Sequence, residues 1–211
     1  MRAMHRASAD LFGPRFSWEG VEPSGGLDPV LFAEAARRSG HRVEPGHHEA
    51  FRSRYVAILE EELAAAGSGA RPMPGIPELL DHLRGRDDAV LGLLTGNYGE
   101  GAALKLRTVG IDPAWFRIQV FGDDAPTRPG MVAVGLERWG SLSGEAVDPR
   151  RAIVIGDTPK DVACARANGC RCLAVATGNF PVEALRAAGA DVAVEDLTDP
   201  APLLGLIEKP S

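Results

Sequence analysis

The feature that most constrains the fold is the segment at residues 152–169, which reads AIVIGDTPKDVACARANG. It begins with four apolar residues, a run typical of a strand buried on both faces of a parallel sheet. A glycine ends this run, and two aspartates, Asp157 and Asp161, follow four positions apart. Residues 162–167 then have a helical pattern that closes at an Asn-Gly pair. This order of strand, polar turn and helix predicts an α/β fold with ligands at the carboxyl end of the strand.

Asp157 and Asp161 are the first candidates for chemistry. Two carboxylates held close together repel each other unless a cation or a proton lies between them. Oxygen ligands of this kind suit Mg²⁺, which keeps several waters and binds one or two carboxylates together with a substrate phosphate. In the alternative interpretation, one aspartate caps the helix and the other lies in its first turn, with no metal. The segment alone leaves both interpretations open.

Strands and helices alternate along residues 71–211. Apolar runs predict strands at residues 89–94, 118–121, 152–155, 172–176 and 191–194. The expected helices lie at residues 77–84, 100–109, 129–139, 162–167 and 181–188. This βαβα order predicts a Rossmann-like three-layer core, in which helices cover both faces of a parallel sheet.

Residues 1–70 have a different character, because their apolar residues recur at helical spacing and no segment has a clear strand pattern. The pattern predicts a helix capped at Asp28. The expected helices are at residues 1–12, 28–40 and 45–66. The segment at 67–77, GSGARPMPGIP, predicts a linker or hinge. We therefore expect a small all-α domain at 1–70 and an α/β core at 71–211.

Composition limits the classes of function. The chain has 211 residues, of which 45% are hydrophobic and 25% charged, as in soluble globular proteins, and its net charge of −6 argues against a nucleic-acid-binding surface. No apolar run reaches the roughly 18 residues of a membrane span, and the first residues have no apolar signal core. Cys164, Cys170 and Cys172 lack zinc-site spacing and are expected to be small buried residues in a reducing compartment. We expect a cytoplasmic protein that binds neither nucleic acid nor membrane.

Polar residues follow the first three expected strands of the core. Thr95, Gly96 and Asn97 follow the first, Arg128 lies beyond the second, and the two aspartates follow the third. The carboxyl ends of parallel strands share one edge of a sheet, so these residues can converge. A hydroxyl, two N–H groups at a helix start and a guanidinium favour a phosphate, and a phosphate beside Mg²⁺ suits phosphoryl transfer. Taken singly, Thr95 is more often a helix cap and Arg128 more often a surface charge, and only their joint pattern favours a phosphate site.

These motifs resemble those of the haloacid dehalogenase-like (HAD) hydrolases. LLTGN at 93–97, Arg128 after GDDAPT, and GDTPKD at 156–161 resemble the second, third and fourth motifs of that family. The tail at 176–197 is also similar, and residues 1–70 resemble the small helical cap. Phosphoglycolate-phosphatase-like members are the nearest in character.

The resemblance implies a Mg²⁺-dependent phosphatase that hydrolyses a small phosphorylated metabolite through an aspartyl phosphate. Thr95, Arg128 and Asp157 would have catalytic roles, with Asp161 either a second metal ligand or a neighbour of the ligand. The implied site consists of the phosphate-binding residues Thr95, Gly96, Asn97 and Arg128 and the metal-site residues Asp157 and Asp161. A dehalogenase or a phosphomutase on the same scaffold is an alternative. A receiver-like signalling domain shares the sheet and an acid cluster, but the helical first third and the GDxxxD spacing argue against it.

The first motif of the family, an apolar strand followed by DxDxT, is not found in this sequence. Its first aspartate is the nucleophile and its second is the general acid and base. In the family this strand lies between those expected here at 89–94 and 152–155, so its loss would expose two apolar strand edges and favour a homodimer. Either the natural protein begins about twenty residues earlier, or the chain is a catalytically inactive HAD-fold protein that binds phosphate and Mg²⁺.

Overall fold

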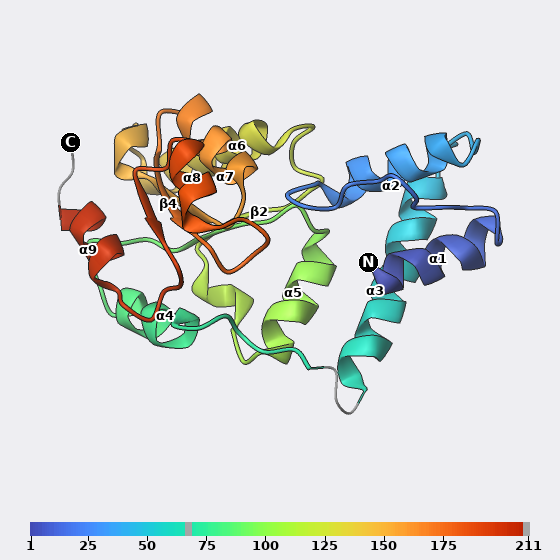
Figure 1. Cartoon of the computed structure of the whole chain (residues 1–211), viewed down its shortest axis with the longest axis horizontal. Helices are drawn as coiled ribbons and strands as arrows, with labels where there is room; N and C mark the ends of the chain where they lie inside the picture. The colour runs from blue at the N-terminus through green and yellow to red at the C-terminus, as the bar shows by residue number, and fades with distance from the viewer. Residues whose placement is uncertain (66–68, 209–211) are drawn as a thin grey trace. The chain divides into compact units, whose positions relative to one another are not determined.

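A computed structural model describes residues 1–65 and 69–208 (Figure 1). The chain forms two compact units. Unit 1 comprises Met1–Arg71, Thr95–Pro113 and Phe121–Pro126, and unit 2 comprises Pro72–Leu94, Ala114–Val120 and Thr127–Ser211. Residues 66–68, which overlap the predicted linker, lie outside the described residues. Unit 1 thus includes two segments of the predicted core, and a cap at 1–70 over a core at 71–211 stays a prediction.

Unit 1 is helical and has an aromatic core. Its helices are α1 (Arg2–Phe12), α2 (Asp28–Arg38), α3 (His47–Ala64) and α5 (Gly99–Thr108). Helix α3 packs against both α1 and α5. Phe32 and Phe51 are fully buried, and their rings stack with centroids 4.1 Å apart. The indole of Trp18 donates a hydrogen bond of 2.9 Å to buried Ser8, so these two polar groups of the core are paired. The four predicted helices are confirmed, with ends shifted by a few residues.

Unit 2 is an α/β structure with parallel strands. Its strands are β1 (Gly92–Leu94), β2 (Ile118–Val120), β3 (Ile153–Gly156), β4 (Arg171–Val175) and β5 (Val192–Val194). Its helices are α4 (Ile76–Arg84), α6 (Arg128–Ser143), α7 (Pro159–Ala167), α8 (Val182–Ala187) and α9 (Ala201–Glu208). A short 3₁₀ helix at Pro149–Arg151 precedes β3, and another, at Pro113–Trp115, precedes β2.

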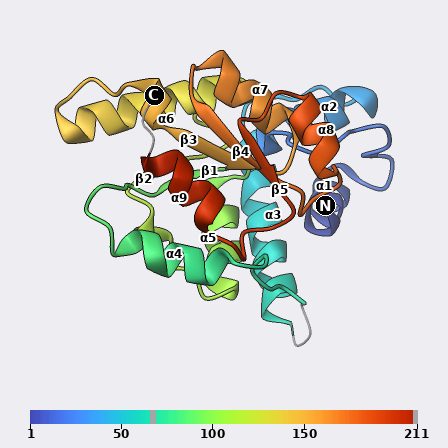
Figure 2. The same ribbon diagram turned by 60° about the vertical axis from the view of Figure 1, so that its left-hand side comes forward.

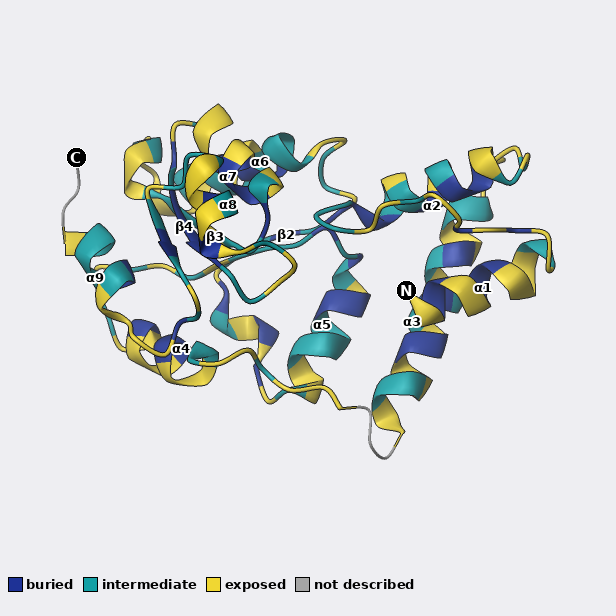
Figure 3. Cartoon of the chain, viewed as in Figure 1, coloured by how far each residue is buried: buried dark blue, intermediate teal, exposed yellow. Residues whose placement is uncertain are grey.

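Strand β4 is the centre of this unit, and four of its five residues are buried (Figure 3). Because side chains alternate along a strand, its two faces pack against different helices. Cys172 and Ala174 belong to the core formed with α6, α7 and α8, whereas Leu173 and Val175 pack with α4 and α9 (Figure 2). The predicted three-layer α/β architecture is therefore confirmed.

The strands form two separate sheets. β1 pairs with β2, and β4 pairs with β3 on one side and β5 on the other, all in parallel. Strands β1 and β3 each have one edge without a strand partner in the described chain. Ile155 of β3 is 41% exposed, whereas Leu173 of β4 is fully buried. The inner strands of α/β sheets are normally buried on both faces, so β3 exposes apolar surface as expected, whereas Leu93 and Leu94 of β1 are only partly exposed.

Several boundaries differ from the sequence predictions. Helix α7 begins at Pro159, three residues earlier than expected, because Thr158 caps it. Helix α6 continues beyond residue 139 and ends before Gly144, whose φ of 75° suits the left-handed conformation that stops a helix. Residues 89–91 do not form the first part of β1, and α9 was not predicted.

The predicted burial of the cysteines is confirmed, since Cys164, Cys170 and Cys172 are buried and unbridged, and the reducing compartment stays a prediction. Burial raises the pKa of each thiol, that of Cys172 to about 12. None of the helices in the described part of the chain is long and apolar enough to cross a bilayer.

Candidate functional site

The turn between β3 and α7 holds Asp161 in a capping box. The amide and the hydroxyl of Thr158 donate to Oδ2 of Asp161 at 3.0 and 2.8 Å, and the amide of Asp161 donates to the Thr158 hydroxyl at 3.3 Å. A Cβ at Gly156 would lie 2.3 Å from Cγ of Asp161, so the preceding glycine leaves room for this carboxylate. One oxygen of Asp161 is therefore used by the start of its own helix.

Arg128 uses the other oxygen of Asp161. Its Nε and Nη2 atoms lie 2.9 and 2.6 Å from Oδ1. Asp161 is 2% exposed and the Arg128 side chain 18%, so the pair is largely shielded from water. The pair joins the start of α6 to the start of α7. Thus the structure brings together two predicted site residues, but it occupies both oxygens of Asp161. To act as a metal ligand, Asp161 would have to give up at least one of these contacts.

The carboxylate of Asp157 differs from that of Asp161 in exposure and in hydrogen bonding. It directly follows β3 and is partly exposed. No hydrogen bond or ion pair to its carboxylate is found within residues 1–65 and 69–208. A Cβ at Gly178 would lie 2.1 Å from its Oδ2 atom, so the backbone after β4 passes directly against the carboxylate. Asp157 is therefore the aspartate of this turn whose oxygens remain available to a ligand.

A Mg²⁺ ion fits this turn through one carboxylate. Magnesium commonly takes one or two protein carboxylates and completes its octahedron with water and substrate phosphate. Asp157 supplies one such carboxylate, and nowhere in the described chain do three His, Cys, Asp or Glu side chains gather as a metal cluster. The Asp157 carboxylate is thus compatible with a magnesium site that water and substrate phosphate complete.

The other predicted site residues, Thr95, Gly96 and Asn97, form a tight loop in unit 1, directly after β1. The Asn97 amide donates to the Thr95 hydroxyl oxygen at 3.2 Å. A Cβ at Gly96 would lie 2.0 Å from the carbonyl oxygen of Gly26, so this position accepts only glycine without backbone movement. The amide of Asp28 also donates to the Gly96 carbonyl at 2.7 Å. The segment that begins α2 therefore holds this loop.

Asp28 makes further contacts that the sequence analysis missed. It does not cap α2, since the helix begins at this residue and has no side-chain cap. Its Oδ2 atom accepts from the Tyr98 amide at 3.1 Å, and its Oδ1 from the Asn97 side chain at 3.3 Å. Lys105 donates to the Asn97 side-chain oxygen at 2.8 Å. Burial raises the pKa of Asp28 and lowers that of Lys105, because both charges have lost hydration.

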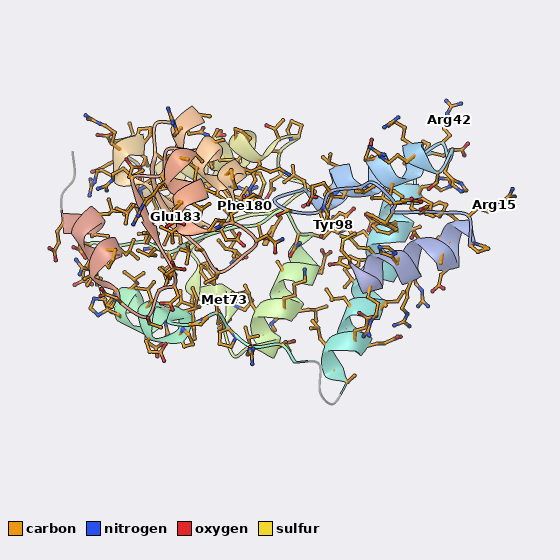
Figure 4. The ribbon with its side chains drawn as sticks, in the orientation of Figure 1. Arg15, Arg42, Met73, Tyr98, Phe180 and Glu183 are labelled. Atoms are coloured by element: carbon orange, nitrogen blue, oxygen red, sulfur yellow. The ribbon has the colours of Figure 1, made fainter. Side chains whose placement is uncertain are left out.

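Tyr98 lies at the start of α5 and is fully buried (Figure 4). Its ring contacts His48 and Tyr55, with centroids 5.5 and 6.1 Å away, and the Arg52 guanidinium lies 5.4 Å from its centroid. Its hydroxyl has no hydrogen-bond partner among the described residues. Burial raises the Tyr98 pKa far above its ordinary value, so this hydroxyl remains a neutral donor.

Comparisons with known proteins connect these features to a family. The model of the HAD-hydrolase-like family matches residues 127–200, which contain Arg128, Asp157 and Asp161. No curated protein matches the sequence.

Solved structures share the fold over nearly the whole chain. A hydrolase from Pseudomonas syringae aligns with a TM-score of 0.69 at 20% identity, covering 98% of this chain and 90% of its own. CbbY from Rhodobacter sphaeroides, solved with xylulose-1,5-bisphosphate, aligns with a TM-score of 0.69 at 21% identity, with coverages of 94% and 87%. A predicted phosphoglycolate phosphatase from Haemophilus somnus gives 0.66 at 19% identity, with coverages of 96% and 89%. The resemblance to HAD-like hydrolases is confirmed, in sequence for residues 127–200 and in fold for nearly all of the chain.

Proposed function

We propose that this chain is the scaffold of a Mg²⁺-dependent phosphatase of the HAD type that hydrolyses a small phosphomonoester. The observation that carries this proposal is the contrast between the two aspartates after β3. Asp161 is fixed by Arg128 and Thr158, whereas Asp157 presents a carboxylate with no partner in the described chain. A carboxylate of this kind suits a metal ion, and a guanidinium such as that of Arg128 suits a phosphate. The family match to this segment and the HAD-like fold support the assignment.

In this proposal each residue of the site has one role. Asp157 holds the ion, and bound Mg²⁺ neutralises charge on the phosphate. The Thr95 hydroxyl and the N–H of Gly96 donate to phosphate oxygens. Arg128 has five N–H donors, and those not directed at Asp161 are available to a phosphate oxygen. Asp161 keeps the guanidinium in a fixed orientation and does not contact the substrate.

The aspartyl-phosphate route also needs a nucleophile. A carboxylate oxygen attacks phosphorus, the bond from phosphorus to the ester oxygen breaks, and the leaving alcohol takes a proton from a general acid. Water then hydrolyses the acyl phosphate and regenerates the carboxylate. We place this nucleophile at the end of an additional parallel strand between β1 and β3, because each of these strands has an edge without a partner in the described chain.

The test is hydrolysis of para-nitrophenyl phosphate with Mg²⁺. It compares the chain as given, a form extended upstream in the same reading frame, and an Asp157→Asn variant of that form. Asp148→Asn, which alters an exposed aspartate of unit 2 before β3, is the matched control. We expect activity in the extended form that Asp157→Asn abolishes and Asp148→Asn preserves. Activity of the given chain, lost in its own Asp157→Asn variant, would contradict the placement of the nucleophile.

A second candidate is a catalytically inactive protein that binds phosphate and Mg²⁺. The observation in its favour is that the Asp157 carboxylate and the Arg128 guanidinium, held by Asp161, are groups that bind an ion or a phosphate without themselves attacking phosphorus. It predicts Mg²⁺ binding that Asp157→Asn weakens, with no turnover in either length of chain. Release of halide, or isomerisation of a sugar phosphate in place of hydrolysis, would instead assign a dehalogenase or a phosphomutase.

A further inference from the structure

Asp28 is a buried carboxylate in unit 1 that the proposed catalytic roles do not use. It is 3% exposed, and it lies at the first residue of α2 without capping that helix. Removing a carboxylate from water is unfavourable unless hydrogen bonds and an opposite charge compensate. The compensating groups here belong to the segment after β1 and to α5, about seventy residues further along the chain.

The contacts of Asp28 fall on three consecutive residues. Its backbone amide donates to the Gly96 carbonyl, its Oδ1 accepts from the Asn97 side chain, and its Oδ2 accepts from the Tyr98 amide. A single residue therefore fixes both the backbone and one side chain of the segment that carries the expected phosphate-binding groups. Each carboxylate oxygen has a different donor, so neither can be replaced by an N–H group without losing a contact.

Lys105 completes this arrangement from within α5. Its ammonium donates to the Asn97 side-chain oxygen, while the Asn97 side-chain nitrogen donates to Asp28. Both ends of the Asn97 amide are thus occupied by protein groups, which fixes its orientation. Asn97 consequently has little left to offer a phosphate directly, in contrast to Thr95, whose hydroxyl proton has no acceptor in the described part of the chain.

We propose that Asp28 and Asn97 are positioning residues, which with Lys105 hold the loop at residues 95–97 in the form that binds phosphate. This inference rests on the proposed function, since it assigns the loop a phosphate ligand. It moves Asn97 from the residues that contact phosphate to those that act through their neighbours. The groups left for phosphate in this loop are the Thr95 hydroxyl and the backbone N–H of Gly96, because the Asn97 amide donates to the Thr95 hydroxyl oxygen.

The experiment uses inorganic phosphate as the probe, with Mg²⁺ present, and the full chain. Phosphate affinity is measured by calorimetry, and exchange of the Tyr98 amide proton is followed by NMR. The variants are Asp28→Asn, Lys105→Met and the double variant. Glu34→Gln, which removes an exposed carboxylate from the same helix α2, is the matched control.

We expect Asp28→Asn to weaken phosphate binding about ten- to a hundredfold, as for other residues that orient ligand-binding groups. Exchange of the Tyr98 amide should accelerate about tenfold or more, because its hydrogen bond to a carboxylate is weakened or lost. Glu34→Gln should change neither quantity. Asp28→Asn with wild-type phosphate affinity would overturn the inference and leave the proposed function intact.

The double variant separates positioning from stability. Lys105→Met leaves the buried Asp28 charge without its nearby cation, so it should lower the urea midpoint, and adding Asp28→Asn should restore much of that loss. Phosphate affinity should stay low in the double variant, because the carboxylate of Asp28 that accepts from Asn97 and Tyr98 is still absent. Recovery of affinity together with stability would show a merely structural role. If wild-type protein binds no phosphate, the proposed function fails and the inference fails with it. Faster Tyr98 amide exchange in Asp28→Asn would then show only that Asp28 holds this segment of the backbone.

Discussion

Replacement of Asp161 by alanine should destabilise unit 2 by about 3 kcal/mol, whereas the same change at Asp157 should be nearly neutral. The capping box with Thr158 contributes about 1 kcal/mol. The ion pair contributes more, since removing one partner of a buried pair costs about 3–5 kcal/mol. Arg128 is 18% exposed and regains part of its hydration, so we take about 2 kcal/mol for this contact. Asp157 has no comparable contact in the described chain, and changes at such positions usually stay within about 0.5 kcal/mol.

The assay is urea unfolding followed by tryptophan fluorescence. Trp18 lies in unit 1, so a Trp18→Phe background confines the signal to Trp115 and Trp139 of unit 2. With a slope of about 2 kcal/mol per molar urea, the Asp161→Ala midpoint should fall by about 1.5 M.

Two results would refute this reasoning. Equal midpoint shifts for Asp161→Ala and Asp157→Ala would mean that the two carboxylates have equivalent structural roles. A small shift for Asp161→Ala, combined with loss of Mg²⁺ binding in Asp161→Asn, would mean that Asp161 is a metal ligand and that its contacts with Arg128 and Thr158 add little stability.

Three other predictions follow from single contacts. Gly178→Ala should weaken Mg²⁺ binding roughly tenfold, because its Cβ would displace the Asp157 carboxylate, and calorimetry that finds unchanged affinity would exclude this position as the ligand. Cys172, whose thiol pKa burial raises to about 12, should react with a thiol reagent about a hundredfold more slowly in native protein than in denaturing urea. Burial raises the pKa of Asp28 above 3.8, so the folded protein binds this proton more tightly than the unfolded chain, and this group's contribution to stability falls as pH rises from 3.8 through the raised pKa. Asp28→Asn should therefore flatten that part of the curve of urea midpoint against pH.

The parts of the fold set by local pattern were predictable from sequence. The apolar run before Asp157 predicted β3, and the polar turn after it placed candidate ligands at the strand's end. Which aspartate is free could not be read from the same pattern, because the answer depends on Arg128, 33 positions before Asp161. The interpretation without a metal is right that an aspartate lies in the first turn of α7, but it is wrong about the cap, which is Thr158, and Asp161 is buried instead of lying on the surface. The magnesium interpretation stays a prediction.

Asp28 is a second residue whose local structure was predictable from sequence and whose long-range contacts were not. An aspartate followed by proline is a good local signal for a helix start, and α2 does begin there. The side chain, however, accepts hydrogen bonds from residues 97 and 98, and no periodicity or spacing relates positions so far apart. Long-range contacts of a buried charge are decided by packing, which a single sequence does not display.

One further parallel strand would both pair with the open edges of β1 and β3 and bring a second acid close to the Asp157 carboxylate. Strands β1 and β3 end the two sheets of unit 2 with unpartnered edges in the described chain, and Ile155 is 41% exposed where an inner strand would be buried. A parallel strand paired with both edges would satisfy their backbone groups and cover apolar surface. Its carboxyl end would lie at the same edge as Asp157, because parallel strands share that edge. An acid at this end would supply the second carboxylate of a Mg²⁺ site and the nucleophile. The packing of the sheet and the chemistry of the site therefore favour the same position, which is why we assign the nucleophile there and not to another acid of the described chain.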